Sequence, residues 1–135
     1  MNLFRSPSEK LAGRLAGLES EAATLEARLA EAREEDTSAQ ARHAEDLADG
    51  LPVDKWRKAR ESAEKKAADA ARDLKAARDA AEIVRQKLAD ARHEEALSDL
   101  KARHDAAEVA LPGVLADVKA ALLPFAAALS RLEAI

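Results

Sequence analysis

The sequence contains no cysteine and no tyrosine, and its 135 residues include only two phenylalanines and one tryptophan. Without cysteine, the chain cannot form disulfides, carry out thiol chemistry or bind zinc through thiolates. With aromatic residues at 2% of the chain, it also cannot build a thick aromatic core. We therefore expect a thin core made of small aliphatic side chains.

Long hydrophobic runs are also missing. The N-terminal stretch MNLFRSPSEK has no apolar core of the kind that a secretory signal needs. The longest uncharged run late in the chain is AALLPFAAALS at 120–130, which is 11 residues long. A membrane-spanning helix needs about 20 residues. We expect no membrane span, and a protein that is cytoplasmic or associated with a larger particle.

Alanine and leucine dominate what is present, with 35 and 18 residues respectively. Both are strong helix formers. Charged residues make up 36% of the chain, are mixed in sign and leave a net charge of −4. This balance is typical of long solvated helices rather than of disordered chains. The composition predicts an all-α fold of elongated, packed helices.

The first predicted helix covers about residues 7–48. It begins at SPSE, where Ser6 is the N-cap, Pro7 the first helical residue and Glu9 the third, which together form a capping box. Apolar residues then recur every three or four positions along one face, interrupted by Asp36. They are Leu11, Leu15, Leu18, Ala22, Leu25, Leu29, Ala32 and Ala39.

The stretch DGLPVDKW at 49–56 ends this helix. Gly50 can adopt the left-handed conformation just past a helix end, and Pro52 cannot continue the helix without losing a hydrogen bond. Asp54 can cap a second helix, predicted over about 54–110. The second helix has its own apolar stripe, interrupted by Arg60. It consists of Trp56, Ala63, Ala67, Ala70, Leu74, Ala77, Ala81, Val84, Leu88 and Ala91.

Two arrangements fit this break: a fold-back into an antiparallel hairpin, or a hinge in an intermolecular coiled coil. Facing residues of an antiparallel pair have a constant sum of residue numbers. A sum of 99 pairs Leu25 with Leu74 and His43 with Trp56, and it centres the turn on Asp49 and Gly50. The stripes leave open a shift of one heptad. The coincidence of register and turn favours the fold-back.

Charge supports the same arrangement. Residues 8–49 carry 5 basic and 11 acidic side chains, a net charge of −6. Residues 54–78 carry 9 basic and 5 acidic side chains, a net charge of +4. Opposite charges therefore face each other in a hairpin, whereas a parallel homodimer of the first helix would bring like charges together.

The apolar phase changes at RHEEA, residues 92–96, which indicates a different packing partner for the rest of the chain. The LPG at 111–113 predicts a second reversal, so residues 111–135 should form a third, apolar helix folded back on the central one. Alternatively, Pro124 bends this segment into two short pieces that wrap the central helix.

The predicted third helix carries only four charged residues and is apolar nearly all round. Because one central helix cannot cover so much apolar surface, we expect this segment to mediate oligomerisation or docking to a protein partner. Its partner-binding stripe is predicted to be Leu115, Val118, Leu122, Phe125, Leu129 and Leu132.

The sequence offers no catalytic constellation, since its serines lie in helices or caps without a glycine-rich strand turn. We expect neither an enzyme nor a bound cofactor. Two of the three histidines, His93 and His104, share a helix face but lie about 16 Å apart along it. They cannot share a metal ion within one chain. An inter-chain metal site stays open, as does a position for both histidines at the edge of the seam with the third helix.

A basic cluster, KWRKAR at 55–60, could contact phosphates or an RNA base. Its candidate nucleic-acid-binding residues are Lys55, Trp56, Arg57, Lys58 and Arg60. Against this function, the hairpin register places acidic residues 34–36 opposite Lys65 and Lys66, and the whole chain is acidic. We expect the cluster to serve the hairpin, with Trp56 packing over His43.

These observations predict a non-enzymatic structural or interaction protein. The hairpin would serve as a spacer, and the C-terminal segment would bind a protein partner or another copy of the chain. A short, alanine-rich chain without cysteine is typical of a bacterial or bacteriophage assembly or accessory protein. The alternative is a small inhibitor or nucleic-acid-binding adaptor that acts through the basic hairpin tip.

Overall fold

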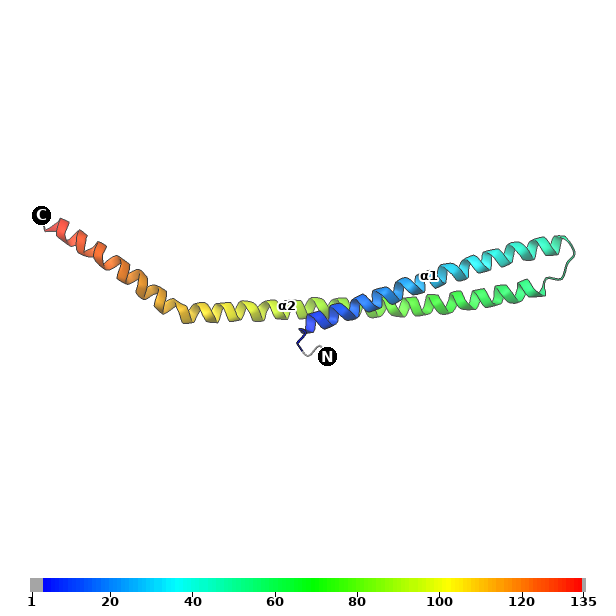
Figure 1. The fold of residues 1–135 in the computed structure, drawn as a ribbon, viewed down its shortest axis with the longest axis horizontal. Coiled ribbons are helices and arrows are strands. Elements are labelled where there is room, and N and C mark those ends of the chain that lie inside the picture. Colours follow the sequence, from blue (N-terminus) through cyan, green and yellow to red (C-terminus); the bar gives the residue numbers. More distant parts are fainter. Residues whose placement is uncertain (1–3, 135) are drawn as a thin grey trace. The chain divides into compact units, whose positions relative to one another are not determined.

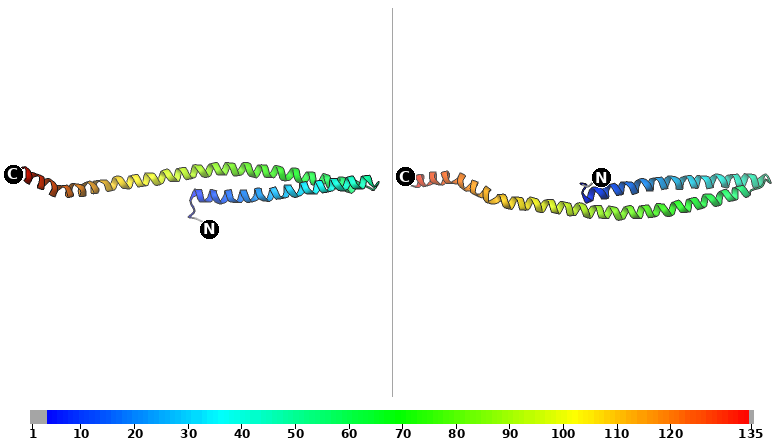
Figure 2. Two further views of the ribbon diagram at one scale, coloured as in Figure 1. Left: turned by 90° about the horizontal axis from the view of Figure 1, so that it is seen from above. Right: turned by 60° about the horizontal axis from the view of Figure 1, so that its bottom comes forward.

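The computed structural model describes residues 4–134, which form two helices, α1 (Pro7–Ala48) and α2 (Asp54–Glu133). The chain divides into two units, Met1–Ala91 and Arg92–Ile135. In the first unit, α1 runs antiparallel to the beginning of α2 (Figure 1). The two views of Figure 2 also show these segments side by side. The fold is therefore an all-α helical hairpin, as the apolar stripes predicted.

The beginning of α1 is the predicted capping box. The Ser6 hydroxyl accepts a hydrogen bond from the Glu9 backbone N–H at 3.3 Å, and the Glu9 carboxylate accepts one from the Ser6 N–H at 3.2 Å. Two N–H groups that lack a partner within the helix are thereby satisfied. Pro7 stands at the start of the helix, where its missing N–H has no cost.

The end of α1 is fixed by Gly50, which has a φ of 70°. The Leu51 N–H donates to the Asp46 carbonyl at 2.8 Å, and the Gly50 N–H donates to the Leu47 carbonyl at 3.2 Å. This pair of bonds is the Schellman motif, which needs a left-handed residue just past the helix. The fold-back therefore begins where the sequence predicted it.

The beginning of α2 corrects one detail of the prediction. Asp54 is the first residue of α2 and not its cap. The cap position belongs to Val53, whose carbonyl accepts from the N–H groups of Trp56 at 3.0 Å and Arg57 at 3.1 Å. Asp54 still favours the helix start, because its negative charge lies near the positive end of the helix dipole.

The seam between α1 and α2 is lined mostly by alanine. The buried residues of the described chain all lie on the two predicted stripes, and none of these buried residues is polar or charged. Leu25 packs in one cluster with Leu74 and Ala77, as the proposed register requires. The buried set is Leu25, Ala32, Ala39, Ala63, Ala70, Leu74, Ala77, Ala81, Val84 and Leu88.

Ion pairs cross the edges of the seam, each from a basic residue of α2 to an acidic residue of α1. Because these side chains are a third to two-thirds exposed, each pair contributes only about 0.2–1 kcal/mol. Their direction agrees with the opposite net charges predicted for the two helices. They are Lys66–Glu35 at 2.9 Å, Arg60–Asp36 at 3.4 Å, Arg85–Glu19 at 3.4 Å and Arg78–Glu26.

No third helix is seen among residues 4–134, which corrects the predicted reversal at 111–113. Instead, α2 continues through Pro112, Gly113 and Pro124 to Glu133. A proline inside a helix removes one N–H donor and crowds the carbonyl four residues earlier, but it does not by itself turn the chain around. Gly113 keeps a negative φ, since Gly50 is the only described residue with a positive φ. Residue 135 of the predicted third helix lies outside the described residues.

The register can be tested by cysteine cross-linking, since the chain has no native cysteine. Leu25→Cys together with Leu74→Cys should form an intramolecular disulfide under mild oxidation at low protein concentration. Leu25→Cys with Leu88→Cys is the matched control, because residue 88 lies about 21 Å further along α2. Non-reducing electrophoresis and mass spectrometry distinguish the products. Only inter-chain dimers from the first pair would contradict the hairpin.

Two glycine substitutions should change stability in opposite directions. Gly50→Ala should destabilise the hairpin by about 1 kcal/mol, because alanine is strained at a positive φ although space for its Cβ is open. Gly17→Ala, inside α1 and equally unhindered, should stabilise it by about 0.5–1 kcal/mol. Urea unfolding followed by circular dichroism measures both. Equal effects of the two changes would contradict the role assigned to Gly50.

Candidate functional site

Three places qualify as candidate sites: the basic cluster at the hairpin tip, the apolar segment of the second unit, and a histidine–carboxylate cluster within α2. In the basic cluster, two arginines already have carboxylate partners. Arg57 lies 3.7 Å from Asp54, and Arg60 lies 3.4 Å from Asp36 and 3.9 Å from Glu64. A nucleic-acid phosphate would have to compete with these carboxylates.

Trp56 is half-buried and its indole N–H donates a hydrogen bond to the Asp46 carboxylate. This bond ties α2 to the last turn of α1, which is a structural role for the tryptophan. The Lys55 ammonium lies 4.6 Å from the centre of the same ring, within the range of a cation–π contact. Stacking of an RNA base on the ring face that Lys55 covers would displace the lysine. Within residues 4–134, no ion pair involves Lys58.

The apolar segment differs from the hairpin because its large side chains are exposed. Every described residue from 96 to 134 is exposed. A shallow hollow of about 260 Å³ opens between Leu115, Val118 and Leu122. The exposed fractions of the predicted stripe are 59% for Leu115, 50% for Val118, 56% for Leu122, 64% for Phe125, 47% for Leu129 and 67% for Leu132.

The stripe extends further towards the N-terminus than predicted for the docking segment. Leu97, Leu100 and Leu111 are 52%, 64% and 52% exposed. The change of apolar phase at residues 92–96 had predicted that this part of the chain packs against a third helix. In the structure they belong to the same uncovered helix as the six predicted residues.

By length and composition alone, α2 could also cross a membrane. It contains an 18-residue window with a mean hydropathy of 1.6, none of it buried. The prediction of no membrane span depended on the uncharged run of 11 residues. Any sufficiently apolar window in α2 must extend beyond that run and include Asp117 and Lys119. Each such charge costs about 2.5–3.5 kcal/mol at the middle of a membrane helix.

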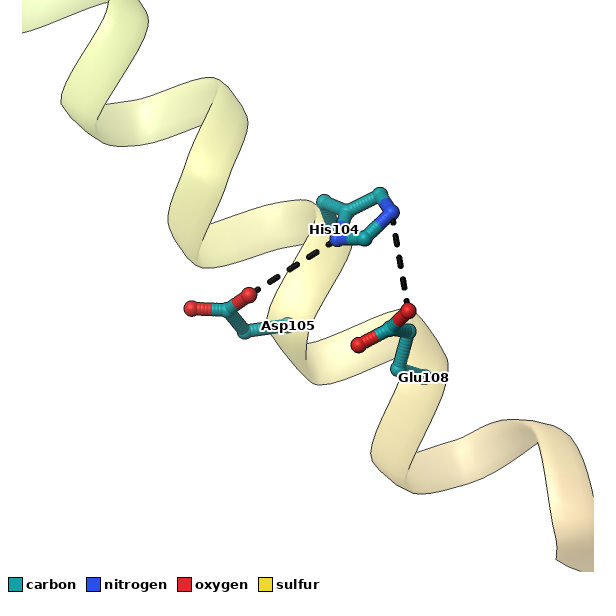
Figure 3. Close-up of side chains that lie close together, drawn as sticks. All are labelled: His104, Asp105 and Glu108. Atoms are coloured by element: carbon teal, nitrogen blue, oxygen red, sulfur yellow. Dashed lines mark ion pairs between the residues drawn. The ribbon is translucent and has the colours of Figure 1, made fainter.

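The third place is a group of His104, Asp105 and Glu108 (Figure 3). Their potential ligand atoms all lie within 4.8 Å of one another, and the two histidine nitrogens lie 3.7 Å from Asp105 and 3.8 Å from Glu108. Sequence reasoning compared only the histidines and missed these carboxylates, although the spacing of four residues between His104 and Glu108 was visible. The three side chains are exposed on one helix, where such a group forms ordinary surface ion pairs.

The pKa of Lys75, on the surface of α2, is shifted. The hydrogen bond from Lys75 to Asp79, at 2.7 Å, together with the negative charge of Asp79, raises the pKa of Lys75. Both side chains are exposed and lie one turn apart on the helix. This is a local pair on a solvated face and marks no site.

The basic cluster gives a direct test of nucleic-acid binding. At physiological salt we expect the protein to bind duplex and single-stranded nucleic acid no better than non-specific contacts allow, with a Kd of about 10⁻⁴ to 10⁻⁶ M. Fluorescence anisotropy with labelled oligonucleotides measures this. Sub-micromolar binding that Arg57→Glu with Lys58→Glu abolishes, but Lys87→Glu with Arg92→Glu does not, would assign the function to the hairpin tip.

Comparison with known proteins gives this chain no relative. No protein-family model, no curated protein and no solved structure matches it. The functional argument therefore depends on the chain's own residues.

Proposed function

We propose that this chain is a non-enzymatic coiled-coil spacer that attaches to a protein, either another copy of itself or a different partner, through its C-terminal apolar segment. The observation that carries this proposal is the exposure of the stripe from Leu115 to Leu132. Six large apolar side chains on one face exceed what a monomeric protein usually leaves in water. Burying each one would contribute about 1.5–3 kcal/mol to association.

The stability of the helix itself supports the same proposal. Most helices in proteins depend on a packed apolar face, and isolated helices are marginal in water. Residues 96–134 of α2 have no buried face, and this part also contains two prolines, each of which costs a helix about 3 kcal/mol. A partner that covers the stripe would supply the missing packing energy.

The hairpin suits the spacer role because it offers little for recognition. Its seam is closed by alanine and leucine, its edges by internal ion pairs, and the two arginines of the tip lie beside carboxylates. The setting we propose is a bacterial or bacteriophage assembly or accessory role, with the protein in the cytoplasm or on a particle. Attachment to nucleic acid through the tip remains the alternative function.

The proposed attachment through the C-terminal apolar segment can be tested by replacing two of its apolar side chains with aspartate. Leu122→Asp with Phe125→Asp should weaken self-association or partner capture by at least about a hundredfold, because two apolar anchors would be replaced by charges. The hairpin should keep its unfolding transition. Sedimentation and circular dichroism measure the two properties separately.

The matched control places the same charges on the opposite face of the same segment. Ala116→Asp with Ala120→Asp should leave association within about threefold of the unsubstituted protein, because these positions lie away from the stripe. If Leu122→Asp with Phe125→Asp also leaves association unchanged, the attachment surface lies elsewhere and the proposal is wrong.

A further inference from the structure

One apolar stripe runs along the whole described part of the second unit. Its members recur every three or four residues, and those larger than alanine are 47–67% exposed, including His104. We call it the C-terminal stripe. It consists of Leu97, Leu100, His104, Ala107, Leu111, Leu115, Val118, Leu122, Phe125, Leu129 and Leu132. A stripe with this spacing fits a partner helix of the same spacing and length.

We propose that the partner is a second copy of this chain, bound parallel and in register along the C-terminal stripe. This inference rests on the proposed function, since it names the occupant of the attachment segment. The stripe's steps alternate between three and four residues, except that the step from Leu111 to Leu115 is a second step of four in succession. In a parallel pair, each stripe residue faces its own counterpart, so this irregular step occurs at the same height in both helices. A different helix would have to reproduce that step.

Charge complementarity favours the parallel copy. Arg103 and Glu108 are five residues apart and flank the stripe on opposite sides. In the heptad register that places Leu97 and Leu111 at a positions, Arg103 is at g and Glu108 is at e. In a parallel in-register pair, Arg103 of one chain therefore lies beside Glu108 of the other, and the contact occurs twice. No other pair of Lys, Arg, Asp and Glu residues meets across these edges, so the edges bring no like charges together.

Within a single chain, the side chains of Arg103 and Glu108 make few interactions. Residues five apart on a helix do not face each other. Among the described residues Arg103 has no ion pair, and Glu108 makes only a 3.8 Å contact with His104 while its side chain stays 68% exposed. The charges are therefore available to a second chain.

The antiparallel alternative is less favourable. When the opposite ends of the stripe are aligned, Glu108 lies beside Lys119 of the second copy, but Glu94 lies beside Glu133. Each contact occurs twice, so two repulsive pairs offset two attractive ones. The parallel pair keeps its two attractive contacts without this opposition.

His104 supports the same register because it is the only polar residue of the stripe. In the parallel pair it faces the His104 of the second copy, and both rings remain beside the carboxylates of Asp105 and Glu108 at the edge of the interface. A shift of one heptad would place each ring against leucine. A single polar residue at an a position is a known determinant of register and oligomeric state in coiled coils.

Single cysteines determine the orientation, because the chain has none of its own. Leu97→Cys alone and Leu132→Cys alone should each give disulfide-linked dimers in the full-length protein under mild oxidation. The expected rate is at least about tenfold above that of Ala102→Cys, which lies on the opposite face. If only an equimolar mixture of the two variants cross-links, the pair is antiparallel and the inference is wrong.

Charge reversal tests the specific contact. Arg103→Glu and Glu108→Arg should each raise the dimer Kd about tenfold, since both turn two attractive contacts into repulsive ones. The double variant should return to within about twofold of the unsubstituted protein, as measured by sedimentation equilibrium. The double variant isolates the pair from the separate effect of each change on helix stability. A double variant no better than the single ones would overturn the assignment.

Failure of this inference is distinguishable from failure of the proposed function. A full-length protein that stays monomeric at high micromolar concentration, but floats with vesicles of phosphatidylcholine and phosphatidylglycerol, would overturn the second copy as partner and assign the segment to a membrane. A monomer that binds a different protein in a manner sensitive to Leu122→Asp with Phe125→Asp would overturn it too, while leaving the proposed attachment function intact. Dimers that cross-link at both single cysteines support it.

Discussion

The hairpin depends on the contact between two helix faces that are lined mostly by alanine. Six of its ten buried residues are alanine, and leucine or valine occupies the other four positions. Each alanine contributes little hydrophobic free energy, and the seam compensates through length, with layer after layer of small contacts. A larger residue in one layer would force the helices apart and loosen the neighbouring layers as well. Among the described residues, the seam buries no polar or charged group.

The two units of the chain use the same amino acids with different results. In the first unit the apolar stripe is covered by α1, and the exposed faces carry charges paired across the seam. In the second unit the stripe contains more leucine and one phenylalanine, yet every described residue from 96 to 134 is exposed. Composition alone does not distinguish these situations, because both segments are rich in alanine and leucine. The difference lies in whether a partner strip of matching length is available, and this is why the attachment function is proposed for the second unit.

Most of the hairpin could be predicted from the sequence because its signals are local and agree with one another. The SPSE box fixes the start of α1, and the register of the two stripes agrees with a turn at Gly50, which favoured the pairing of Leu25 with Leu74 over a hinge. The continuation of α2 past residue 111 could not be predicted, because Pro112 followed by Gly113 resembles the break at Gly50 in composition. The difference is a backbone angle: Gly50 is left-handed, whereas Gly113 remains helical. For the candidate site, periodicity predicted the stripe from Leu115 to Leu132, whereas its exposure follows from the continuation of α2 without a third helix among the described residues. The group around His104 was missed because only the histidines were compared, although the spacing of four residues already placed Glu108 one helical turn from His104.

The constant register of the hairpin has a consequence for how its length can vary over evolution. Removing seven residues from α1 and the seven facing residues from α2 would leave the turn, the capping box and every remaining layer in place. The reach of the hairpin would change by about 10 Å for each paired deletion or insertion. A change of seven residues in only one helix would instead pair each stripe residue beyond it with the neighbouring heptad of the other helix and would move every ion pair there out of register. Such a hairpin can therefore be lengthened or shortened in steps of seven paired residues, without changes to the turn or to the capping box.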